Sequence, residues 1–95
     1  MMTNTTTKTM TSIKVQVRYF ASLREALGPT ESVELPHGAT VAMLREALVA
    51  RGGRHAEVLA RGRAVRCSLD QQMAAEEAAL REGAEVAFFP PVTGG

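Results

Sequence analysis

The chain has 95 residues and a formal net charge of +1, because 11 Lys and Arg face 10 Asp and Glu. This length allows one domain with a modest core, and the balanced charge indicates neither a nucleic-acid nor an anionic membrane partner. The single cysteine excludes an internal disulfide framework and is consistent with a reducing compartment. No segment has the pattern of a signal peptide or a membrane span, so we expect a cytoplasmic protein.

Residue patterns in the first third of the chain predict a leader, two strands and a short helix between the strands. Residues 1–12 are rich in Thr and lack apolar periodicity, which indicates a disordered leader. Residues 13–20 alternate apolar and polar side chains and predict a strand. Ser22 and Glu25 have the spacing of a capping box, which predicts a short helix ended by a Gly-Pro pair. Residues 30–35 alternate again and predict an antiparallel neighbour of the first strand.

The middle of the chain predicts the main helix. Thr40 is a suitable N-cap, and Gly52-Gly53 is expected to end the helix. Residues 55–61 predict one or two further helical turns, with Val58 and Leu59 buried. The apolar stripe of the main helix consists of Val41, Leu44, Ala47 and Leu48.

The last third predicts short strands. Val65, Cys67 and Leu69 alternate along one strand face, and Asp70-Gln71 predicts the turn that follows. A short strand is expected to begin at Met73, and residues 85–89 predict the final strand. The order of elements predicts an α+β domain over residues 13–89, with one main helix packed across one face of a mixed sheet.

Strand parity predicts two phenylalanines on the side of the sheet away from the helix. If Val17 and Phe88 face the helix, Phe20 and Phe89 face solvent. Met73 is a candidate to join them. An apolar patch of this kind predicts a docking surface.

Residues 90–95 predict an extended, functional C-terminal arm. Pro90 and Pro91 fix the backbone near polyproline geometry and end the final strand. Gly94 and Gly95 have no Cβ, so they can enter a slot too narrow for other residues. The terminal carboxylate of Gly95 is therefore the candidate reactive group, the alternative being a passive end.

Other candidate chemistry is weak. Cys67 lies on an apolar strand face and is predicted to pack in the core. His37 and His55 have no partner at ligand spacing, so no metal site is expected. Glu76-Glu77 predicts a solvated loop. The basic segment from Arg51 to Arg66 predicts a solvated face, with an acidic protein as the next alternative and RNA third.

The C-terminal residues carry a specific resemblance. Residues 83–95, Gly-Ala-Glu-Val-Ala-Phe-Phe-Pro-Pro-Val-Thr-Gly-Gly, resemble the end of the small, MoaD-type subunit of molybdopterin synthase. The likeness extends to Asp70-Gln71, where that family often has Asn-Gln, and to residues 13–27. It implies a ubiquitin-like β-grasp fold and a sulfur carrier that binds no cofactor itself.

The resemblance also implies roles for residues and partners. An activating adenylyltransferase of the ubiquitin-activating type would use ATP to adenylate Gly95, and a sulfur donor would convert the adenylate into a thiocarboxylate. Gly94 would permit threading into the large catalytic subunit of molybdopterin synthase, where sulfur passes to a cyclic pterin precursor. The chain itself would be a non-catalytic, sulfur-donating subunit. The implied partner-binding residues are Phe20, Met73, Phe89, Pro90, Pro91, Val92 and Thr93.

Three other functions stay open from the sequence. The chain could carry sulfur for another pathway, such as formation of thiamin or cysteine. It could instead be a ubiquitin-like modifier that forms isopeptide bonds through Gly95, or an interaction module with passive glycines. Neither nucleic acid nor a membrane is an expected partner.

Overall fold

The computed structural model describes residues 12–60 and 64–90. The strands are β1 (Ser12–Tyr19), β2 (Thr30–Pro36), β3 (Arg66–Leu69), β4 (Gln72–Met73) and β5 (Glu85–Phe89). The helices are α2 (Ala21–Leu27), α3 (Val41–Val49) and α4 (Gly53–Leu59). The predicted order of strands and helices is confirmed. The first strand starts at Ser12, and the rest of the predicted leader lies outside the described residues.

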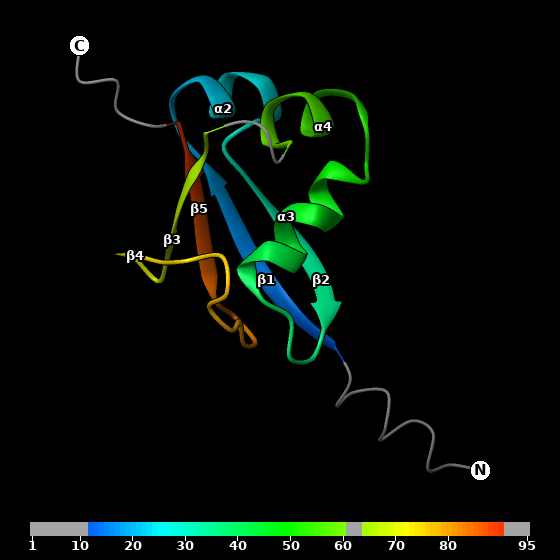
Figure 1. Cartoon of the computed structure of the whole chain (residues 1–95), viewed down its shortest axis with the longest axis vertical. Helices are drawn as coiled ribbons and strands as arrows, with labels where there is room; N and C mark the ends of the chain where they lie inside the picture. The colour runs from blue at the N-terminus through cyan, green and yellow to red at the C-terminus, as the bar shows by residue number, and fades with distance from the viewer. Residues whose placement is uncertain (1–11, 61–63, 91–95) are drawn as a thin grey trace.

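All five strands form one mixed sheet in the order β2-β1-β5-β3-β4. The two central strands, β1 and β5, run parallel, whereas the other neighbours are antiparallel. Helix α3 crosses one face of this sheet (Figure 1). The arrangement confirms the α+β prediction of a main helix on a mixed sheet.

The core lies between this face and the helices. Every second residue of β1 points into it, and the apolar residues of α3 meet them from the other side. Burying one such side chain contributes roughly 1.5–3 kcal/mol. The largest apolar side chains that are fully enclosed are Tyr19, Phe88, Leu44, Leu48 and Leu59.

The start of α2 differs from the prediction. The helix begins at Ala21, and its N-cap is Phe20, which makes no side-chain capping hydrogen bond. Ser22 therefore lies inside the helix, and the capping box predicted for Ser22 and Glu25 is wrong. The chain turns out of β1 at Ala21, whose φ of 54° is unusual for a residue with a Cβ. This backbone turn replaces the capping box as the start of the helix.

The boundaries and the buried stripe of α3 also differ in part. Thr40 is the N-cap as predicted, since its hydroxyl accepts a hydrogen bond from the Met43 amide at 3.3 Å. Ala47 is exposed, and Arg45 is buried in its place. The buried positions 41, 44, 45 and 48 follow the spacing of a single helix face, which Ala47 does not share. The helix ends at Val49, before the predicted Gly52-Gly53.

The hairpin between β3 and β4 has the predicted turn at Asp70-Gln71. Both residues have positive φ, 50° and 72°, which is the geometry of a two-residue type I′ turn. The turn sets the register that places Met73 opposite Ser68. The carboxylate of Asp70 also accepts a hydrogen bond from the Glu85 amide at 3.0 Å, which ties the turn to the start of β5.

Candidate functional site

The candidate site begins where β5 ends. Phe89 is the last residue of this strand and Pro90 follows it, so the central strand of the sheet leads directly into the predicted arm. The remaining predicted residues of the arm lie outside the described residues, and their roles stay predictions. These are Pro91, Val92, Thr93, Gly94 and Gly95.

Two phenylalanines lie beside each other at this end of the sheet. Tyr19 is paired with Phe88 across the parallel strands, and the Phe20 amide donates to the Phe88 carbonyl at 3.2 Å. Continuing this register by one residue places Phe20 next to Phe89 on the face away from the helices. Phe20 is 40% exposed and Phe89 is half-buried. The outward orientation predicted from parity is thus present at both positions.

Met73 lies farther along the same face. It is 62% exposed and stands opposite Ser68, which in turn stands opposite Ala87 of β5. The structure therefore places Phe20 and Phe89 together and Met73 toward the edge of the sheet. We call Phe20, Met73 and Phe89 the apolar face.

Arginines border the apolar face on both sides of β5. Arg66 of β3 stands opposite Phe89, and Arg18 of β1 stands opposite Ala87. The guanidinium carbon of Arg18 lies 5.5 Å from the centre of the Phe20 ring, within cation–π range. Arg18 also forms an ion pair with Glu85 at 3.1 Å. Sequence reasoning did not single out Arg18, although its parity matches that of Phe20.

A polar cluster supports the apolar face from the core side. The carboxylate of Glu31 accepts a hydrogen bond from the Tyr19 hydroxyl at 2.7 Å, contacts His55 Nε2 at 2.9 Å and is paired with Arg51. The Tyr19 ring stacks on Phe88 with the ring centres 6.3 Å apart. Tyr19 and Phe88 each precede one of the two outward phenylalanines. Sequence reasoning missed this cluster because its members are far apart in the chain.

The pKa values in this cluster follow from burial and hydrogen bonding. Burial acts to raise the pKa of Glu31, but hydrogen bonds from Tyr19, His55 and Arg51, with the charge of Arg51, outweigh it and hold the pKa below its usual range. Burial, followed by the hydrogen bond to Glu31 and its charge, raises the pKa of Tyr19 far above its usual range. Glu31 is therefore a carboxylate and Tyr19 a neutral hydrogen-bond donor near neutral pH.

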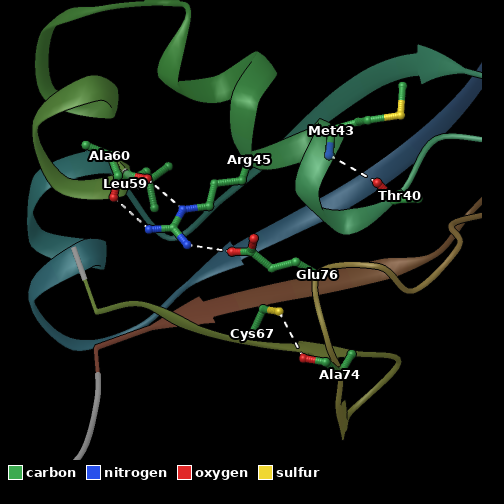
Figure 2. Close-up of polar contacts among 8 residues, drawn as sticks. All are labelled: Thr40, Met43, Arg45, Leu59, Ala60, Cys67, Ala74 and Glu76. Atoms are coloured by element: carbon green, nitrogen blue, oxygen red, sulfur yellow. Dashed lines mark hydrogen bonds and ion pairs between the residues drawn. The ribbon is translucent and has the colours of Figure 1, made fainter. Parts of the chain in front are cut away.

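A second polar cluster lies under α3. Figure 2 shows the Arg45 guanidinium reaching between the end of α4 and the loop that carries Glu76. Nε and Nη2 donate to the carbonyls of Leu59 and Ala60, both at 2.7 Å, and Nη1 donates to Glu76 at 2.6 Å. The loop prediction is correct for Glu76, whose side chain is 32% exposed, but a buried arginine also binds its carboxylate. This cluster has a structural role.

Cys67 packs in the core, as predicted. It is 6% exposed, and its thiol donates to the Ala74 carbonyl at 3.3 Å (Figure 2). Burial, followed by the nearby charge of Glu76, raises the pKa of the thiol, and the charge of Arg45 opposes this only in part. Such a thiol is a poor nucleophile. Among the described residues, no group of His, Cys, Asp and Glu is arranged to hold a metal ion.

Comparison with known proteins identifies the family. Residues 17–95 match the ThiS family. The chain belongs to the ThiS family. It is 37% identical to the molybdopterin synthase sulfur carrier subunit of Haemophilus influenzae. The alignment covers 85% of this chain and 99% of that relative. The resemblance found in the C-terminal residues is thereby confirmed.

Solved structures share the fold of this chain. SAMP1, a small archaeal modifier protein from Haloferax volcanii, superposes with a TM-score of 0.71 at 30% identity, over 86% of this chain and 99% of that one. A chain in the complex of subunits 1 and 2 of the molybdopterin-converting factor from Helicobacter pylori matches at a TM-score of 0.61 and 21% identity. The match covers 87% of this chain and 100% of that one. The second match concerns the fold alone. The fold of this ThiS member is the ubiquitin-like β-grasp.

The described part of the chain offers a surface for binding, with a strand that leads into the arm. None of its helices has the length and apolar character needed to cross a membrane. The side chains that lie together on the outer face are aromatic, aliphatic and cationic. Side chains of these kinds can bind another protein. The candidate group for chemistry in this ThiS member is therefore not on this face but in the C-terminal arm.

Proposed function

We propose that this chain is the sulfur carrier subunit of a molybdopterin synthase and acts in the cytoplasm. The observation that carries the proposal is the similarity to such a subunit over 99% of that relative's length. The outward placement of Phe20 and Phe89 beside the start of the arm adds support, because a carrier must be held by its partner close to the group that it delivers.

The chemistry of a carboxylate explains why activation is needed. The α-carboxylate of Gly95, with a reference pKa of about 3.5, is ionised and can attack the α-phosphorus of ATP, releasing pyrophosphate. The acyl-adenylate that forms can accept sulfur from a donor, and AMP leaves with the electron pair of the broken C–O bond. The product is a thiocarboxylate. ATP is bound by the activating enzyme, and this chain supplies only the carboxylate.

The proposed acceptor complex uses the apolar face. The large catalytic subunit would cover Phe20, Met73 and Phe89 while the arm of residues 90–95 enters its active site. There the thiocarboxylate sulfur would pass to a cyclic pterin precursor. Gly94 and Gly95 allow the arm to enter a narrow channel because neither has a Cβ.

The first experiment is the intact mass of the chain after incubation with a cognate activating enzyme, ATP and a sulfur donor. We expect a shift that matches replacement of one oxygen by sulfur, and no shift in a chain lacking Gly95. An unchanged mass, with the same activating enzyme working on another carrier, would overturn the proposal.

A second experiment tests the apolar face. We expect Phe89→Ala to weaken binding to the large subunit while the fold is retained, as measured by calorimetry and by urea unfolding. Phe20→Ala is the matched variant at a more exposed position and should weaken binding with less effect on stability. Loss of folding in the Phe89 variant, without a separate binding defect, would show that Phe89 serves the core.

A second candidate function is protein modification, which the similarity to SAMP1 favours. In that function the activated Gly95 carbonyl would form an amide with a lysine of a target instead of accepting sulfur. Mass spectrometry of cell lysate for lysines that carry the C-terminal residues of this chain distinguishes the two. Such conjugates, together with an absence of thiocarboxylate, would place modification ahead of sulfur transfer.

A further inference from the structure

The two arginines beside the apolar face are placed on opposite sides of the central strand. Arg66 of β3 stands opposite Phe89. Arg18 of β1 precedes Phe20 by two residues, so both arginines lie on the face of the sheet that carries the two phenylalanines. Since β5 lies between β1 and β3, the guanidinium groups border the phenylalanine pair from both sides. The apolar face thus has a cationic border.

This border carries an excess of positive charge. Arg18 is paired with Glu85, but its side chain remains 47% exposed. Arg66 is exposed, and it has no carboxylate partner within residues 12–60 and 64–90. Across the sheet from these arginines lie the neutral residues Ala87 and Phe89. The two guanidinium groups of Arg18 and Arg66 are therefore matched by the single carboxylate of Glu85.

The type of cation also matters. A guanidinium is planar, stays charged at any working pH and can donate two parallel hydrogen bonds to one carboxylate. It is more weakly hydrated than an ammonium, so covering it in an interface costs less free energy. The contact of Arg18 with the Phe20 ring orders its side chain before a partner arrives.

We propose that Arg18 and Arg66 select the partner: the protein surface that covers Phe20 and Phe89 presents carboxylates opposite these two guanidinium groups. The inference rests on the proposed function only in taking the apolar face as the docking surface. A second copy of this chain would bring like charges together and does not fit. An acidic border around an apolar centre is the surface that matches in both charge and polarity.

Binding of the cognate large subunit, measured by calorimetry at low and high salt, tests the proposal. For Arg66→Glu we expect a loss of affinity on the order of tenfold at low salt and a weaker dependence on salt than in the unchanged chain. Arg54→Glu makes the same change of charge on an exposed arginine of α4 and should leave affinity within about twofold. Equal affinity in the two variants would overturn the proposal.

A reciprocal change separates charge recognition from other defects. Replacing the partner's acidic residue nearest to position 66 by Arg should restore affinity for Arg66→Glu and weaken binding of the unchanged chain. If no acidic residue of the large subunit gives such rescue, the proposal fails. Urea unfolding of each variant shows whether a loss of affinity comes from a loss of folding instead.

Phe20→Ser distinguishes failure of this inference from failure of the proposed docking surface. If Phe20→Ser abolishes binding and Arg66→Glu does not weaken it, the docking surface stands and the charge selection is wrong. If Phe20→Ser binds like the unchanged chain, the docking surface itself is wrong. In the expected result both variants lose affinity, and only the arginine variant changes the salt dependence.

Discussion

The guanidinium of Arg45 lies 2.6 Å from the carboxylate of Glu76 and joins α3 to the loop that precedes β5. The arginine side chain is 6% exposed, whereas that of Glu76 is 32% exposed. The same guanidinium binds two carbonyls at the end of α4. At a helix position that faces the core, Arg45 therefore forms three hydrogen bonds that hold separate segments together.

We expect Arg45→Met to lower the free energy of unfolding by roughly 2–4 kcal/mol, because the carbonyls of Leu59 and Ala60 lose a buried donor. Glu76→Gln should cost less, since its carboxylate is partly solvated and the amide oxygen can still accept a bond. Urea unfolding measures both. Equal stability of Arg45→Met and the unchanged chain would contradict the structural role.

The low pKa of Glu31 predicts a dependence of stability on acid. Because the folded-state pKa lies below the usual value of 4.5, the stabilisation by Glu31 is fully present above that pH and is lost as the pH falls through the folded-state pKa. We expect the urea midpoint to decrease below about pH 4.5. Glu31→Gln should be less stable at neutral pH and show a shallower decrease, whereas an unchanged pH profile would count against the cluster.

The buried thiol of Cys67 predicts slow alkylation. We expect iodoacetamide to label Cys67 at mild alkaline pH at least roughly tenfold more slowly in the folded chain than in urea, since the reactive thiolate is disfavoured and enclosed. Intact mass against time measures the rate. Comparable rates in the two conditions would show that the thiol is accessible, contrary to its core position.

The turn at Asp70-Gln71 predicts a stabilising substitution. Gln71 has a φ of 72°, a region that glycine enters without the penalty of a Cβ. We expect Gln71→Gly to raise the free energy of unfolding by roughly 0.5–1 kcal/mol. Gln72→Gly, at the adjacent strand position, is the control and should be destabilising. A loss of stability in the Gln71 variant would mean that its side chain contributes more than its backbone strain costs.

The regular elements could be predicted from the sequence because they depend on local patterns. Alternation along residues 13–20 and 85–89 predicted both central strands, and the same parity predicted that Phe20 and Phe89 face outward. Thr40 was identified as an N-cap because capping needs only a hydroxyl next to the helix. The Asp70-Gln71 turn likewise follows from local chemistry.

The contacts between distant segments could not be predicted in this way. Arg45 occupies a buried position of α3 only because carbonyls at the end of α4 and the Glu76 carboxylate meet there. The same reasoning applies to Glu31, whose partners come from β1, α4 and the segment between α3 and α4. The capping box at Ser22 failed because a backbone turn at Ala21 starts the helix there, two residues before the start that a Ser22 cap would give.

The parallel pairing of β1 with β5 has a consequence for folding kinetics. Val17 pairs with Val86, so the two central strands of the sheet come from opposite ends of the described chain. Such distant pairing requires closure of a long loop, which slows folding relative to a local hairpin. Phe20 and Phe89 become neighbours only when β5 docks. A partner that recognises both rings therefore distinguishes fully folded chains from folding intermediates.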